Sequence, residues 1–126
     1  MTLRNWLALL LALLIVAVCI ACAWVVRAQL DPLLQRLADL EPMIEQNHPN
    51  ALPYARQWYA DFDRCCHWLT FFVSHDALEQ ASEAAQAMVL FLRQKDTVHA
   101  LENLHLCRRR IQHIRDWEQF LPQNIF

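Results

Sequence analysis

Glycine is absent from this chain of 126 residues, and serine occurs only at Ser74 and Ser82. A Walker phosphate loop, a GxGxxG dinucleotide turn and a GxSxG nucleophile elbow all need glycine, because only glycine tolerates the backbone bend or the close approach of a phosphate. Three large enzyme classes are therefore excluded. We expect a protein that is not an enzyme and that has no cofactor, and the sequence identifies no catalytic residue and no small-molecule substrate.

Charge is also scarce. Charged residues make up 19% of the chain, hydrophobic residues 56%, and the formal net charge is -2. A single lysine, Lys95, stands against ten arginines. Because no overall basic field exists to attract a polyanion, we expect no nucleic-acid partner.

An uncharged run of twenty-one residues spans 6–26 and lies between Arg4 and Arg27. As a helix it is about 30 Å long, which matches the hydrocarbon core of a bilayer. Trp6 and Trp24 lie near its two ends, where indole rings prefer the membrane interface, and Arg4 and Arg27 can snorkel beyond them, so these four are the predicted membrane-interface residues. Residues 1–5 then form a short flank, and the run predicts a single-pass membrane anchor.

Two alternatives to the anchor stay open. Ala21-Cys22-Ala23 has the small-x-small form of a signal-peptide cleavage site, although signal cores are usually about 7–15 residues long. The run can also be a buried helix of a soluble protein. Basic residues near both ends are almost balanced, and residues 28–126 carry nine basic and thirteen acidic side chains. We favour an extracytoplasmic domain, because little positive charge holds it inside.

Residues 27–121 have helical periodicity and no strand alternation of useful length, so we predict an all-α domain. A first segment begins with Asp31 as N-cap and continues directly from the anchor or starts anew. Pro42 is expected to kink or divide it, and a break follows at 47–50. Its apolar stripe is Leu33, Leu37, Leu40 and Ile44.

Three further helical segments follow. The second, from Pro53 to Val73, carries a wide aromatic face. Trp68 and Phe71 lie off that face, so this helix is expected to need more than one neighbour. A β-strand over 68–73 is the alternative. The third begins at an Asp76–Glu79 capping box, and the fourth runs from Val98 until Pro122 stops it. The expected core positions are Tyr54, Trp58, Phe62, Cys66, Leu69 and Val73; Leu78, Ala81, Ala85, Met88 and Leu92; and Ala100, Leu104, Cys107, Ile111 and Ile114.

Short loops make successive helices antiparallel neighbours, so we predict one transmembrane helix followed by an antiparallel bundle of about four helices over 27–121. Stacked helical hairpins, as in tetratricopeptide arrays, are the alternative, although no 34-residue repeat is evident.

Cysteine and histidine offer weak candidate chemistry. In an oxidising compartment Cys107 can bridge Cys66 or Cys65, with Cys66 and Cys107 the pair we favour. The odd count of thiols argues against a disulfide framework, and core-facing Cys66 and Cys107 with an exposed Cys65 are the simpler interpretation. A zinc set from these thiols, His67 and His105 has poor spacing, so no metal ligand is predicted.

The only basic cluster is Arg108-Arg109-Arg110. Consecutive helical residues fan around the axis, so a solvated, ion-paired face is the simplest interpretation, with Arg108 reaching acidic groups on a neighbouring helix. Arg109 and Arg110 are candidate contacts for an acidic partner or anionic lipid.

The chain ends on a further candidate contact. Asn124, Ile125 and Phe126 follow Pro122 and form a tail over 122–126. Large apolar side chains at a free end fray unless they dock, either on the domain's own core or on a partner.

The whole pattern resembles the bacterial domain-of-unknown-function family 4363, which comprises short membrane-anchored helical proteins that end in Asn-Ile-Phe. The resemblance implies a bacterial membrane protein that acts beside another integral membrane protein, and it supplies no activity. It rests on the anchor, the Leu37/Leu40/Ile44 stripe, Trp58, Trp68 with His75 seven residues later, Ala100 and Leu104 after Asp96-Thr97, and the terminal Asn124, Ile125 and Phe126.

We therefore expect a single-pass protein of the bacterial cell membrane. Its leading function is a helical interaction or scaffold module beside a membrane-protein partner or a second copy of itself. One alternative is a metal- or thiol-dependent sensor or enzyme that uses His75, Cys65, Cys66 and His105. The other is a structural envelope or assembly factor with no discrete ligand.

Overall fold

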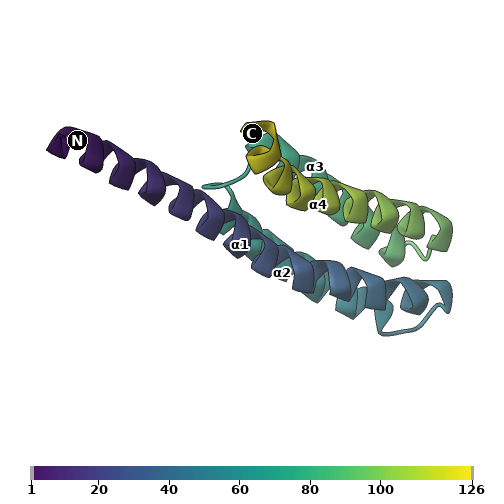
Figure 1. Ribbon diagram of the computed structural model, residues 1–126. Coiled ribbons are helices and arrows are strands. Elements are labelled where there is room, and N and C mark those ends of the chain that lie inside the picture. The colour runs from purple at the N-terminus through teal and green to yellow at the C-terminus, as the bar shows by residue number, and fades with distance from the viewer. Residues whose placement is uncertain (1, 126) are drawn as a thin grey trace.

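The computed structural model describes the backbone of residues 2–125 and the side chains of residues 2–116. It contains four helices: α1 (Leu3–Glu45), α2 (Ala51–Leu69), α3 (His75–Arg93) and α4 (Thr97–Ile125) (Figure 1). The described backbone has no strand, which confirms the all-α prediction. The strand alternative for 68–73 is wrong, because α2 continues to Leu69 and a turn follows.

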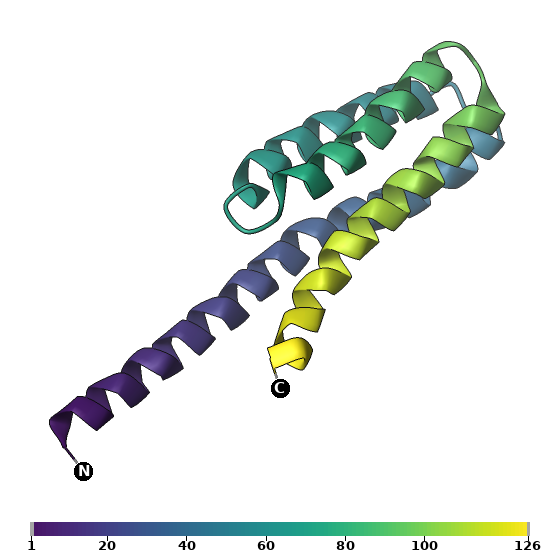
Figure 2. The same cartoon turned by 90° about the horizontal axis from the view of Figure 1, so that it is seen from above.

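The helices form an antiparallel bundle from which the first half of α1 projects (Figures 1 and 2). Helix α1 packs on α2 and α4, and α3 packs on the same two helices. Each helix therefore has two neighbours around a shared core, which is the arrangement of a bundle rather than of stacked hairpins. The predicted antiparallel bundle is confirmed, with the second half of α1 as its first member.

Helix α1 passes through two prolines without ending. The prediction that Pro42 divides the first segment is wrong, and the helix runs on directly from the candidate anchor. Proline removes the main-chain donor for the carbonyl four residues earlier. Those carbonyls belong to Ala28 and Ala38, which are exposed residues where water can take the place of the lost donor.

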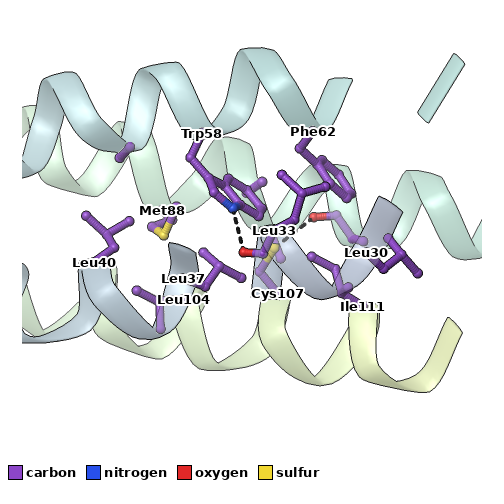
Figure 3. Close-up of a cluster of buried hydrophobic side chains, with 14 of the residues drawn as sticks. Leu30, Leu33, Leu37, Leu40, Trp58, Phe62, Met88, Leu104, Cys107 and Ile111 are labelled. Atoms are coloured by element: carbon purple, nitrogen blue, oxygen red, sulfur yellow. Dashed lines mark hydrogen bonds between the residues drawn. The ribbon is translucent and has the colours of Figure 1, made fainter. Parts of the chain in front are cut away.

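The core is built on Trp58 and the predicted stripe of α1 (Figure 3). Trp58 is fully buried and stacks on Phe62, with ring centroids 5.2 Å apart. Its Nε1 donates a 2.9 Å hydrogen bond to the main-chain oxygen of Leu33 in α1. A buried indole N–H needs such an acceptor, so this bond sets the register between α1 and α2. The buried residues of α1 are Val26, Leu30, Leu33, Leu37, Leu40 and Ile44.

The buried face of α2 is rotated from the predicted one near the helix end. Cys65 is buried, whereas Cys66 is only half-buried, so the prediction of an exposed Cys65 and a core Cys66 is wrong. The reason is that the stripe advances by three residues from Phe62 rather than by four. As expected, α2 has more than one neighbour, since it packs on both α1 and α3. Trp68 and Phe71 do not take part in this packing, because both are exposed.

A seam of small residues joins α3 to α4. Ala81, Ala84 and Ala85 are buried against the α4 stripe, which lets the two helices approach closely. Leu78, Ala81, Ala85 and Met88 are buried as predicted, whereas Leu92 is half-buried and the buried Ala84 was not predicted. The predicted N-cap, Asp76, lies inside α3. The helix begins at His75, and its N-cap residue Ser74 makes no side-chain capping bond.

Helices α1 and α3 are each followed by a residue in the position that glycine most often occupies after a helix. Asn47 and Lys95 follow α1 and α3 with φ of 53° and 59°, in the left-handed region that favours glycine. Each is enclosed by a bond that spans five residues, as in a Schellman motif. These bonds run from His48 N to Met43 O and from Asp96 N to Phe91 O, both 2.9 Å.

Helix α4 runs to Ile125, so the prediction that Pro122 stops it is wrong. A proline in the last turn of a helix costs a single main-chain hydrogen bond, and the helix continues across it as α1 does across its own two. The domain boundary at 121 is therefore not a helix end.

Candidate functional site

The first half of α1 lies outside the bundle. Its apolar side chains are exposed, and only 6% of the most apolar stretch is buried within the protein. The helix is long and apolar enough to cross a membrane, which is a statement about length and composition. The interpretation as a buried helix of a soluble protein loses its support, because this stretch has almost no protein neighbours.

The four predicted membrane-interface residues bracket that stretch. Arg4 is exposed and so is Trp6, at 56%. At the other end Trp24 is 73% exposed, and Arg27 is half-buried beside the first core residue, Val26. The helical rise separates the two indoles by about 27 Å, close to the thickness of a hydrocarbon core.

A polar seam runs along α1 and α4. The Glu41 carboxylate accepts a 2.9 Å hydrogen bond from Arg108 Nη2, and its Oε1 lies 3.2 Å from His105 Nε2. Asp31 Oδ1 lies 3.0 Å from Arg115 Nε, and the two side chains form an ion pair whose geometry is not that of a hydrogen bond. These pairs confirm that Arg108 reaches an acidic group on a neighbouring helix, and they clamp α4 to the second half of α1.

The other two arginines of the basic cluster diverge, as expected on a helix. Arg110 Nη1 donates a 3.0 Å hydrogen bond to Gln80 Oε1 on α3. Arg109 is exposed, and among the described side chains it has no ion-pair partner. Of the predicted contacts in this cluster, Arg109 is therefore the one most available to a partner.

A shallow cleft of about 410 Å³ lies between α2 and α3. It brings Cys66 and His75 together, whereas Cys65 is buried and His105 lies on the α1–α4 seam. The four residues of the sensor or enzyme alternative do not form one site. Within the described residues no group of three or more His, Cys, Asp and Glu side chains is placed to hold a metal ion. The cleft is lined by Asp63, Cys66, His67, Thr70, His75, Leu78, Glu79 and Ser82.

The three cysteines of the bundle, Cys65, Cys66 and Cys107, are free thiols, and burial raises the pKa of each. Burial raises the pKa of Cys66 to about 12, and the neighbouring Cys65 and Asp63 add to the effect. Burial, with a contribution from Cys66, raises the pKa of Cys107 to about 12 as well. A thiol with such a pKa is a poor nucleophile at neutral pH. The disulfide between Cys66 and Cys107 stays a prediction for an oxidising compartment.

The end of α2 and the turn between α2 and α3 expose three large aromatic side chains that the sequence does not assign to any site. Trp68 is 72% exposed, Phe71 80% and Phe72 40%. The available signal was that Trp68 and Phe71 lie off the apolar stripe of α2. Solvent-facing aromatic clusters commonly mark contact surfaces.

The predicted C-terminal contact cannot be placed. Asn124 and Ile125 belong to α4 by their backbone, but their side chains and the whole of Phe126 lie outside the described residues. Their docking on the core or on a partner stays a prediction.

Comparison with protein-family models, curated proteins and solved structures finds no match for this chain. The resemblance to family 4363 therefore stays a prediction. The fold defines a helical bundle that continues directly into a helix able to cross a membrane.

Proposed function

We propose that this chain is a single-pass protein of the bacterial cell membrane and that its bundle is an interaction or scaffold module beside a membrane-protein partner. The observation that carries the proposal is the division of α1 into an apolar half without protein neighbours and a half built into the core. Anchoring raises the local concentration of the bundle at the bilayer, so that a weak contact with a neighbour suffices.

The polar groups support this proposal over a thiol- or metal-dependent enzyme. Cys66 and Cys107 hold their protons at neutral pH, and His105 is engaged with Glu41. The bundle instead has an exposed surface on which a partner protein can bind, and this surface includes Arg109. We propose that this surface lies on the extracytoplasmic side of the membrane, because the portion after the anchor has little excess positive charge to hold it in the cytoplasm.

Anchoring is tested by alkaline extraction of membranes from cells that express the full chain, with the intact mass measured in parallel. We expect the protein in the membrane pellet at its full mass. A soluble product that begins after Ala23 would overturn the anchor and establish a cleaved signal. Protease added to spheroplasts should digest the bundle, and protection of the bundle would reverse the orientation.

The interaction role is tested by photocrosslinking in cells from position 109, with position 126 as a second site. We expect a discrete adduct with an integral membrane protein or with a second copy of the chain. Gln80 is the matched control, since it already binds Arg110. Absence of protein adducts from both positions would overturn the interaction proposal while leaving the anchor intact.

A further inference from the structure

The two ends of the bundle differ in chemistry. The turns between α1 and α2 and between α3 and α4 lie together at the end far from the projecting half of α1 (Figure 2). They are polar, with the sequences Gln46-Asn47-His48-Pro49-Asn50 and Gln94-Lys95-Asp96, and Thr97 Oγ1 donates a 2.8 Å hydrogen bond to Asn47 Oδ1 between them. The turn between α2 and α3 lies at the opposite end and reads Thr70-Phe71-Phe72-Val73-Ser74.

The register of α1 and α2 fixes the height of the aromatic turn. Trp58 binds the carbonyl of Leu33, so these two residues lie at the same level of an antiparallel pair. Leu69 is eleven residues farther along α2, about 16 Å, and the same descent along α1 leads from Leu33 to Cys22. The turn that follows Leu69 therefore lies level with the last residues of the apolar run of α1.

That level is where a membrane interface is expected. Trp24 and Arg27 lie there on α1, at the end of the stretch able to cross a membrane. Trp68 and Phe71 lie at the same height on the neighbouring helix and its turn, with both side chains mostly exposed. Aromatic rings prefer the headgroup boundary to water, so one surface meets both requirements.

We propose that the last residues of α2 and the α2–α3 turn insert Trp68, Phe71 and Phe72 into the interfacial layer of the bilayer that α1 spans. The bundle is then attached to lipid at two places, by α1 and by this turn. This inference rests on the proposed anchoring of α1. Its occupant is the lipid surface, because the turn is continuous with the predicted membrane boundary on α1, whereas the polar turns are at the opposite end.

Two attachments constrain what one cannot. A single helix leaves the bundle free to rotate about the axis of α1 and to tilt in any direction. With the aromatic turn held in the interface, the end of the bundle that carries this turn faces the bilayer, and α1 cannot tilt in a direction that lifts the turn out of the headgroup layer. The cleft beside His67 and His75 then lies close to the headgroups, since both residues flank the turn.

The test uses the full chain in phosphatidylcholine–phosphatidylglycerol vesicles, with benzoylphenylalanine at one position at a time. Position 71 reports the turn, position 24 reports the anchor, and position 98 is the matched control. Val98 is an apolar side chain that is 65% exposed at the far end of the bundle. All three side chains are exposed, so the replacements should leave the circular dichroism spectrum unchanged. Lipid and protein adducts are separated by mass spectrometry after irradiation.

We expect lipid adducts from positions 71 and 24 in comparable yield, and several-fold less from position 98. Lipid adducts from 24 but not from 71 would overturn this inference and leave the anchor standing. Adducts from 71 to a second copy of the chain would assign the turn to self-association and also overturn it. No lipid adduct from 24 would overturn the anchor itself, and equal yields at 71 and 98 would show that contact is not specific to the turn.

Discussion

The two halves of α1 belong to one unbroken helix and have opposite environments. Residues 3–25 carry apolar side chains around the whole circumference and are almost entirely exposed. From Val26 onward only every third or fourth residue is buried, and the residues between are polar, exposed or, like Leu34 and Met43, only partly buried. The first pattern is typical of a helix surrounded on all sides by an apolar solvent such as lipid. The second is typical of a helix that packs against protein on one face and meets water on the other.

This difference shows that hydrophobicity and burial in protein are separate properties. The more apolar half of α1 contributes almost nothing to the core, whereas the less apolar half supplies six core residues. The same substitution should therefore have different consequences on the two sides of Val26.

The largest expected effect comes from matched pairs of arginines. Leu33→Arg with Leu37→Arg places two unpaired charges at core positions that are 5% and 0% exposed. We expect a loss of more than about 5 kcal/mol, which removes the cooperative unfolding transition. Leu10→Arg with Leu14→Arg has the same spacing on the exposed half, and it should leave that transition in place.

The second pair should fail at the membrane instead. Arginine in the middle of a membrane helix costs about 3 kcal/mol for each substitution on insertion scales, so alkaline extraction should release this variant. Near-ultraviolet circular dichroism of Trp58 follows the bundle in detergent. Unfolding of the bundle by the Leu10 and Leu14 substitutions would show that the first half of α1 packs against protein.

A smaller effect distinguishes two tryptophans of α2. Trp58→Ala empties the site against the second half of α1 and leaves the Leu33 carbonyl without its indole donor, at an expected cost of about 3–5 kcal/mol. Trp68→Ala removes an exposed ring and should change the free energy of unfolding by less than about 0.5 kcal/mol. Chemical denaturation in detergent measures both. A comparable loss for Trp68 would mean that the turn stabilises the bundle directly.

The smallest effect concerns the ion pair that joins Asp61 to the second half of α1. Arg36 Nη1 lies 2.6 Å from Asp61 Oδ2, and this bond, with help from Arg64, holds the pKa of Asp61 below its usual value. The folded chain thus binds fewer protons than the unfolded chain, and the stabilisation present above about pH 4 is lost as the pH falls through the lowered pKa.

Asp61→Asn should flatten that part of the pH dependence by less than about 1 kcal/mol, since both side chains are partly exposed. The free energy of unfolding, measured from about pH 6 to about pH 2, gives the comparison. Asp63→Asn neutralises an exposed carboxylate two residues away and should retain the slope around Asp61. An unchanged slope in Asp61→Asn would remove the pair from the acid response.

Much of this fold follows from periodicity. The stripe from Leu33 to Ile44 and the α3–α4 seam are visible as apolar residues three or four apart. The break at 47–50 is visible as an interruption of that spacing by polar residues and a proline. Helix count and antiparallel order then follow from the short connections. The candidate membrane segment is equally visible, because an uncharged run of its length has few other uses.

What the sequence does not determine depends on neighbours. Cys65 and Cys66 are adjacent and of one type, and only the rotation of α2 against its partners decides which is buried. Pro42 breaks a helix by local rules, yet α1 continues because the affected carbonyl is at the exposed Ala38. The exposure of Phe71 likewise cannot be predicted from the sequence, because it depends on where the helices that pack on α2 lie.

The absence of a joint between the two halves of α1 gives the protein the mechanics of a lever. A change of 10° in the tilt of α1 would carry the paired turns at Asn47 and Lys95, about 30 Å away, through about 5 Å. If α1 spans a bilayer as proposed, small changes in its tilt produce a larger displacement of these turns, which lie at the end of the bundle far from the apolar half of α1.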